Sequence, residues 1–118
     1  MIPLFEESGN LPPGVHPARM DEIEERFGRD SELRRVQMES IRWMVDLAMK
    51  AGVRRIVLNG SFVTDIIDPN DVDCLLLRGT PQLGSKAARR ELRKGLPFLD
   101  ITIARQEAFD EYTRQILP

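Results

Sequence analysis

The chain has 118 residues, a formal net charge of −2 at pH 7 and a hydrophobic content of 42%. This length suits one domain with its own core and is too short for two, and the near balance of acidic and basic residues gives no electrostatic case for general nucleic-acid binding. No apolar stretch approaches a membrane span and the first residues do not read as a signal peptide, so we expect no membrane association.

Cysteine and histidine are each present once, which limits the redox and metal chemistry that the chain can support. Cys74 cannot form an internal disulfide, and this fits the reducing cytoplasm. One cysteine and one histidine do not make a zinc site. His16 lies beside Pro17, where a histidine is more often structural or exposed than in contact with substrate.

The first 18 residues are predicted to form an irregular arm, because they hold four prolines and two glycines. Residues 19–118 are predicted to form a single domain. Its first helix is expected over residues 17–27, with Gly28 as its stop, and a longer helix should run from Asp30 or Ser31 to about Ala51. In the longer helix the apolar residues recur at helical spacing and the charged residues, Arg34 among them, mark the solvated side, whereas Met38 and Trp43 favour a second packed face.

Three short apolar runs are predicted to be strands. The first covers Arg55–Leu58 and breaks at Gly60-Ser61; the second follows Asp71-Val72-Asp73 over residues 74–77; the third covers residues 98–103. A turn is expected at residues 79–81 and helices over residues 82–94 and 106–117. The order predicts an α/β fold with a small mixed sheet packed against helices. The helix over 82–94 is rich in basic residues, which indicates either a solvated face or contact with triphosphate or nucleic acid.

Two aspartates at the start of the second strand carry the chemical prediction. Side chains alternate along a strand, so Asp71 and Asp73 should point the same way, roughly 6–7 Å apart. Asp100 is the only acid in its strand, and it would join the pair if the second and third strands are neighbours. Three carboxylates at one end of a sheet are costly as structure but suit a two-metal site for Mg²⁺ or Mn²⁺. Asp100 could also act as a general base.

Gly60 and Ser61 precede the acidic residues and suit a phosphate-binding turn. Glycine lets the backbone approach a phosphate closely, and free N–H groups at the start of a helical turn favour anions. The alternative is that Pro69-Asn70-Asp71 is only a loop in which Asp68 and Asn70 form Asx turns. That alternative explains the loop but leaves Asp100 without a role.

Taken together, these residues resemble the nucleotidyltransferase superfamily of the DNA polymerase β type. Its pattern is a hydrophobic residue, Gly-[Gly/Ser], about ten residues, Asp-hydrophobic-Asp, and a third acid on a later strand. Here it corresponds to Leu58 to Ser61, Asp71 to Asp73, and Asp100, within roughly residues 31–104. The resemblance implies that Gly60 and Ser61 bind the triphosphate, that Asp71 and Asp73 bind both metal ions, and that Asp100 binds one and assists the nucleophile.

The small size is most similar to the minimal nucleotidyltransferases, many of which are antitoxins of toxin–antitoxin pairs. The resemblance implies Mg²⁺-dependent transfer of a nucleoside monophosphate, with AMP from ATP as the leading case, to a hydroxyl on a partner protein such as a toxin. Minimal members often carry Arg and Gly after Gly-Ser, whereas this chain has Phe62-Val63-Thr64-Asp65. Two alternatives therefore remain: a fold of this type that neutralises its partner by contact without catalysis, and an enzyme that acts on a tRNA end.

Overall fold

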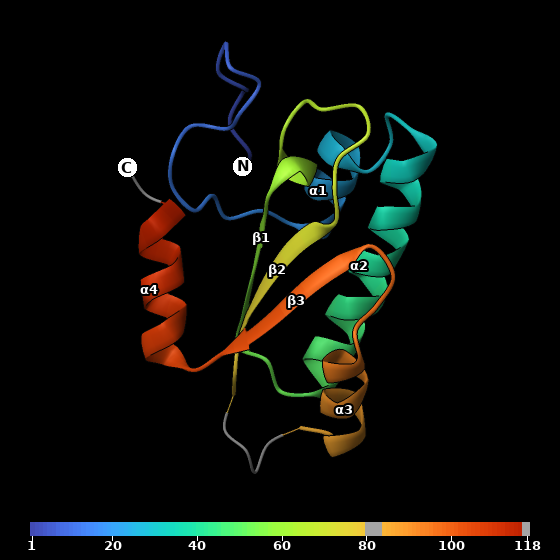
Figure 1. Ribbon diagram of the computed structural model, residues 1–118, viewed down its shortest axis with the longest axis vertical. Helices are drawn as coiled ribbons and strands as arrows, with labels where there is room; N and C mark the ends of the chain where they lie inside the picture. The colour runs from blue at the N-terminus through green and yellow to red at the C-terminus, as the bar shows by residue number, and fades with distance from the viewer. Residues whose placement is uncertain (80–83, 117–118) are drawn as a thin grey trace.

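The computed structural model describes residues 1–79 and 84–116, and within them it is a single-domain mixed α/β fold of four α-helices and a three-stranded sheet (Figure 1). Residues 1–18 contain no helix or strand. The elements are α1 (Met20–Phe27), α2 (Glu32–Lys50), β1 (Arg55–Asn59), the 3₁₀ turn η1 (Ser61–Val63), β2 (Val72–Leu77), α3 (Lys86–Lys94), β3 (Leu99–Ala104) and α4 (Gln106–Ile116).

The sheet has the order β1-β2-β3, so β2 is the central strand. β1 pairs with β2 antiparallel, with Asn59 opposite Asp73. β3 pairs with β2 parallel, with Asp100 opposite Asp73. The second and third strands are therefore neighbours, which is the condition under which Asp100 was predicted to join the acidic pair.

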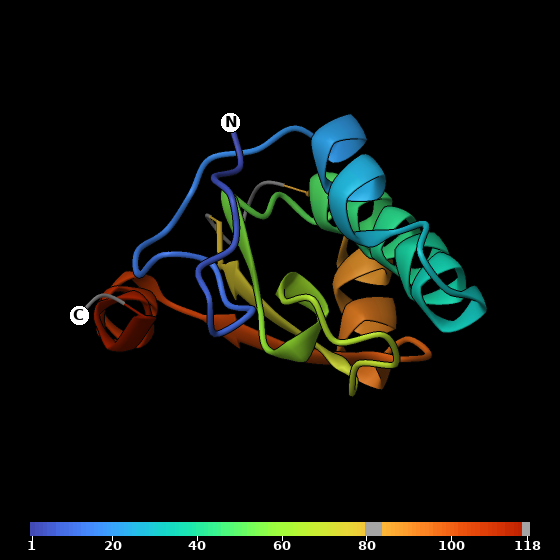
Figure 2. The same ribbon diagram turned by 90° about the horizontal axis from the view of Figure 1, so that it is seen from above.

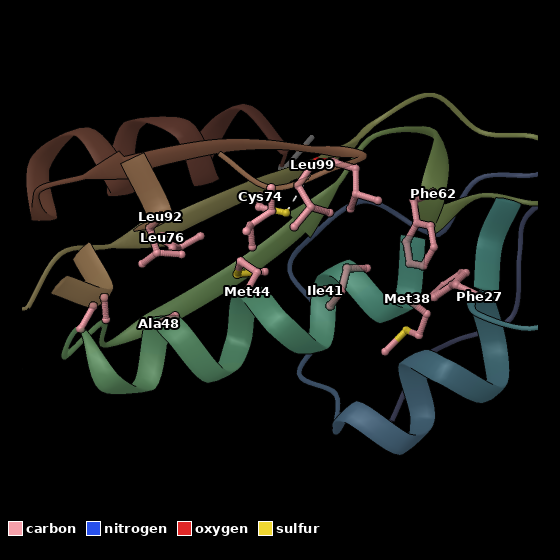
Figure 3. Close-up of a cluster of buried hydrophobic side chains, with 14 residues drawn as sticks. Phe27, Met38, Ile41, Met44, Ala48, Phe62, Cys74, Leu76, Leu92 and Leu99 are labelled. Carbon is pink, nitrogen blue, oxygen red and sulfur yellow. Dashed lines mark hydrogen bonds between the residues drawn. The ribbon is translucent and has the colours of Figure 1, made fainter. Parts of the chain in front are cut away.

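One face of the sheet packs against α2 and α3 and forms the main core. Val72, Cys74 and Leu76 point from β2 toward α2, where Ile41 and Met44 are fully buried. Figure 3 shows this contact, with side chains of α2 directed at the sheet. Full burial of one large apolar side chain stabilises the fold by about 1.5–3 kcal/mol, so this layer supplies most of the cohesion.

The opposite face is covered in part by α4 and the N-terminal arm. Phe109 of α4 packs with Val57 and Leu77, and Val15 of the arm packs against the same cluster. Figure 2 shows α4 on one side of the sheet and α2 with α3 on the other. The end of this face that carries Asp73 and Asp100 stays exposed.

Two helices begin later than predicted. α1 begins at Met20 instead of residue 17, because the N–H of Arg19 donates to the Glu22 carboxylate at 3.0 Å and closes the helix start there. α3 begins at Lys86, because the Ser85 hydroxyl accepts the Ala88 N–H at 3.1 Å. The predicted start of that helix, residue 82, lies outside the described residues, as do residues 80 and 81 of the predicted turn and Leu117.

The third strand begins one residue later than predicted. Of the two residues predicted to form a second packed face of α2, only one is buried. Phe98 has φ +66°, a left-handed conformation that a strand does not allow, so β3 begins at Leu99. Met38 is buried as predicted, but Trp43 is 52% exposed, so its prediction was wrong. In the described part of the chain, no helix combines the length and apolarity needed to cross a membrane.

Candidate functional site

Three polar side chains form a row across the exposed end of the sheet. Asn59, Asp73 and Asp100 occupy matching register positions on β1, β2 and β3, so they point to the same face. Neighbouring strands lie about 4.7–4.9 Å apart, which places each member of the row beside the next. Asp71 lies two residues before Asp73, just outside β2. The structure thus brings the predicted Asp73 and Asp100 together, and it adds Asn59, which the sequence did not single out.

The negative charges of the neighbouring aspartates act on Asp73. The pKa of Asp73 is raised by partial burial and then by the negative charges of Asp100 and Asp71. A cation held near these carboxylates would offset this repulsion, because it attracts each of the negative charges.

Gly60 closes the row at its β1 end and is held against Asp73. Its φ of +87° is in the left-handed region, and a Cβ added there would stand 2.7 Å from the Asp73 Oδ2. Any other residue would both strain the backbone and collide with the carboxylate. The glycine predicted for close phosphate approach is thus also required for the position of Asp73.

Ser61 links the 3₁₀ turn to the segment that leads into β2. Its Oγ accepts the N–H of Asn70 at 2.7 Å, and its carbonyl oxygen accepts the Thr64 hydroxyl at 2.6 Å. The N-cap of η1 is Gly60, so the Ser61 side chain does not serve as that cap. Since the Ser61 Oγ acts as an acceptor here, its own hydrogen remains for donation to a ligand oxygen.

The loop between Ser61 and Asp71 is hydrogen-bonded to side chains of the N-cap and first half of α2. Ser31, Arg34 and Gln37 follow one another at three-residue spacing, and each donates to backbone carbonyls of this loop. The Ser31 hydroxyl donates to the Ile67 oxygen at 3.1 Å, and the Gln37 Nε2 donates to the Asn70 oxygen at 3.0 Å. The residue directly before Asp71 is thus held from two sides, by Gln37 and by Ser61.

Arg34 is the central fastening residue, and its predicted place on the solvated side of the helix was wrong. The side chain is buried and donates to the carbonyls of Phe27, Phe62 and Thr64 at 3.0, 2.7 and 2.9 Å, and also to Ile66. Burial lowers its pKa, and the nearby charges of Asp30, Asp65 and Asp68 oppose that shift. Nothing in the sequence indicates that Arg34 is buried against backbone carbonyls, because a charged side chain in a helix normally faces solvent.

The residues that depart from the minimal nucleotidyltransferase pattern have structural roles. Phe62, which stands near the expected arginine position, is fully buried, and its ring centroid lies 5.9 Å from that of Phe27. Asp65 lies against the N-terminal arm, since its N–H donates to the Gly9 oxygen at 3.1 Å. The His16 Nε2 lies 2.8 Å from the Pro12 oxygen, which accounts for His16 within the arm.

The donor chemistry of the site fits a hard divalent cation. Among residues 1–79 and 84–116, no group of three or more His, Cys, Asp or Glu side chains is already arranged to hold an ion. Mg²⁺ does not need such a cage, because it commonly takes one or two carboxylates together with water and substrate phosphates. Asp73 and Asp100 supply such a pair, with Asp71 beside them.

Comparison with protein-family models gives a match over residues 3–116 to a family described as "Family of unknown function (DUF6932)". Neither the curated proteins nor the solved structures give a match to this chain.

Proposed function

Since the chain belongs to the DUF6932 family, which has no assigned function, we propose from its own residues that it is a nucleotidyltransferase of the DNA polymerase β type. In this proposal it moves AMP from ATP, with Mg²⁺, to a hydroxyl on a partner protein, as an antitoxin acting on its toxin. The observation that carries the proposal is the register of Asp73 opposite Asp100, with Asp71 nearby and Gly60 against the Asp73 carboxylate.

Each residue has a distinct task in this reaction. The backbone of Gly60 and the hydroxyl of Ser61 face the triphosphate oxygens, and Asp71, Asp73 and Asp100 are the residues that would hold Mg²⁺. Bound Mg²⁺ supplies charge neutralisation for the triphosphate. Asp100 accepts the proton of the attacking hydroxyl, whose oxygen bonds to the α-phosphorus while the bond to the bridging oxygen of pyrophosphate breaks.

A second function, binding without catalysis, is favoured by the surface beside the site. Ile66 and Ile67 lie in the loop before Asp71 and are 49% and 72% exposed. Exposed apolar side chains are common at contact surfaces. In this version the fold covers a partner by direct contact, and the acidic row is not used for transfer.

The test is label transfer with ATP labelled either at the α-phosphate or at the γ-phosphate. Purified protein, Mg²⁺ and the product of the adjacent gene should yield that product labelled from α-labelled ATP only, with release of pyrophosphate. Asp73→Asn should abolish the labelling. A stable complex that never acquires label would establish the binding function, and label appearing in added tRNA would identify the acceptor as RNA.

Nucleotide binding can be tested without any acceptor. Mg²⁺ with a non-hydrolysable ATP analogue should raise the melting temperature of the wild type, because a ligand of the native state stabilises it. The same additions should leave the melting temperature of Asp73→Asn unchanged. An equal rise in both proteins would remove Asp73 from the metal site.

A further inference from the structure

A second site lies at the end of the sheet opposite to the acidic row. The parallel strands β2 and β3 end side by side at Leu77 and Ala104, and the chain then departs in opposite directions. α3, which follows β2, packs on the α2 face through Ala88 and Leu92, whereas α4, which follows β3, packs on the other face through Phe109. In α/β sheets, such a divergence at the carboxyl ends of neighbouring strands opens a crevice where ligands bind.

The structure has a cavity at this place. Its volume is about 290 Å³. It is lined by the two residues that follow β2, Arg78 and Gly79, and by the two that follow β3, Arg105 and Gln106. The N–H of Arg78 donates to the Ala104 oxygen at 2.8 Å, which ties the two walls together. A smaller hollow of about 20 Å³ shares Arg78 and Gly79 and adds Arg89 and Arg93 from α3.

The charged residues that line the crevice are arginines, while Glu107 and Asp110 of α4 lie beside it, Asp110 accepting a hydrogen bond from the Gln106 side chain at 2.9 Å. Neither hollow has an acidic lining residue, and within the described chain no carboxylate forms a salt bridge with Arg78 or Arg105. Arg78 and Arg105 both line this hollow, so an anion bound in it would lie near two positively charged residues. Gln106 is also the first residue of α4, where backbone N–H groups have no partner inside the helix.

We propose that this crevice binds a small phosphorylated ligand, such as a sugar phosphate, through the guanidinium groups of Arg78 and Arg105 and the first N–H groups of α4. Arginine presents a planar fork that matches phosphate oxygens. The hollow is open to solvent, its volume of about 290 Å³ is just below the usual range of about 300–1,000 Å³ for small-molecule pockets, and its walls are the residues that directly follow β2 and β3. The site is independent of the acidic row and of the proposed nucleotidyl transfer.

Isothermal titration with ribose 5-phosphate, in EDTA so that the acidic row cannot contribute through a metal ion, tests this site. The wild type should bind ribose 5-phosphate saturably. Arg78→Gln and Arg105→Gln should each weaken binding about tenfold to a hundredfold, as expected for loss of a charge-assisted hydrogen bond. Circular dichroism checks the fold of each variant. If Arg78→Gln does not fold, Arg105→Gln still tests the site, because the Arg105 side chain is exposed.

Two variants serve as controls. Arg114→Gln removes the same charge from α4 at a residue whose guanidinium pairs with Glu111 at 3.3 Å, and it should bind as the wild type does. Asp73→Asn should also bind normally. Failure of the wild type to bind ribose 5-phosphate at millimolar concentration, or binding by both crevice variants as tight as that of the wild type, would overturn the proposal. So would binding of a single-stranded RNA without binding of ribose 5-phosphate, because it would make this a nucleic-acid surface.

Discussion

Asp73 lies beside Asp100 and two residues after Asp71, and this position has a consequence for stability. Its pKa is raised in the folded state by partial burial, Asp100 and Asp71, so the folded protein holds this proton more tightly than the unfolded chain does. The unfolded chain therefore binds fewer protons between the unfolded and the folded pKa, and the stability from this group falls as pH rises through that window. At neutral pH the ionised Asp73 opposes folding.

Asp73→Asn should therefore make the protein without metal more stable at pH 7. We expect a gain of less than about 1 kcal/mol, because the carboxylate is exposed and solvent screens the repulsion. The gain should vanish below about pH 4, where the unfolded carboxyl is also protonated. Urea unfolding at both pH values measures it, with the exposed Glu25→Gln as a charge-matched control; a loss of stability at pH 7 would mean that the carboxylate is needed for folding.

Ser61→Ala separates a phosphate contact from a loop contact. The Ser61 Oγ accepts the Asn70 N–H, so its loss should lower stability by about 1 kcal/mol. If the hydroxyl also donates to a phosphate oxygen, ATP affinity should fall about tenfold to a hundredfold as well. Nucleotide titration and a denaturation curve are compared for each protein; unchanged affinity with lowered stability would show that Ser61 serves only the loop.

At the scale of elements, the loop between η1 and β2 depends on α2 for its shape. Three of its carbonyls, those of Thr64, Ile66 and Ile67, accept hydrogen bonds from Arg34 or Ser31, and Arg34 also donates to the Phe62 carbonyl in η1. A loop of this length without a helix or strand of its own needs such external partners, because buried carbonyl groups have to be hydrogen-bonded. The helix that forms the core is thus also the support of the site.

Arg34→Met should destabilise the protein by more than about 3 kcal/mol, because it leaves several partly buried carbonyls unpaired. Arg35→Met is the matched control: the neighbouring side chain is exposed, and its change should stay within about 0.5 kcal/mol. Denaturant unfolding compares the two. Faster amide exchange in residues 62–66 of Arg34→Met would assign the loss to the loop; similar stability in both variants would contradict the role of Arg34.

The helices and strands could be predicted because their signals are local. Apolar spacing and stop residues such as Gly28 depend only on near neighbours. The alternation of side chains along β2 likewise predicted that Asp73 and Cys74 point to opposite faces of the sheet. The strand pairing that brings Asp100 to Asp73 was a conditional prediction, since nothing in a sequence fixes which strands are neighbours. The burial of Arg34 was missed, because its partners are backbone carbonyls that any residue types provide.

At the scale of the whole molecule, the two proposed sites lie at opposite ends of β2. The acidic row lies at the start of this strand, and Arg78 of the crevice directly follows its last residue. Asp73 and Arg78 are five residues apart, about 16 Å at the rise of a strand. This exceeds a Debye length of about 8 Å at physiological ionic strength, so the two ends should respond separately to substitution.

The double variant Asp73→Asn with Arg78→Gln should show additive stability changes. We expect the sum of the single changes within about 0.5 kcal/mol, because the two side chains share no partner and lie farther apart than coupled pairs do. Urea unfolding of the two single variants and the double variant gives the coupling free energy. A coupling above about 1 kcal/mol would show that the two ends form one electrostatic unit.

The fastening of the loop to α2 also bears on the order of events during folding. The bonds from Ser31, Arg34 and Gln37 join residues 28 to 36 positions apart, so they form only after α2 has docked on the strands. Contacts of such separation must overcome the entropy of closing a long loop. We therefore expect the acidic row to be completed in one of the last steps, and substitutions of Arg34 to accelerate unfolding much more than they slow refolding.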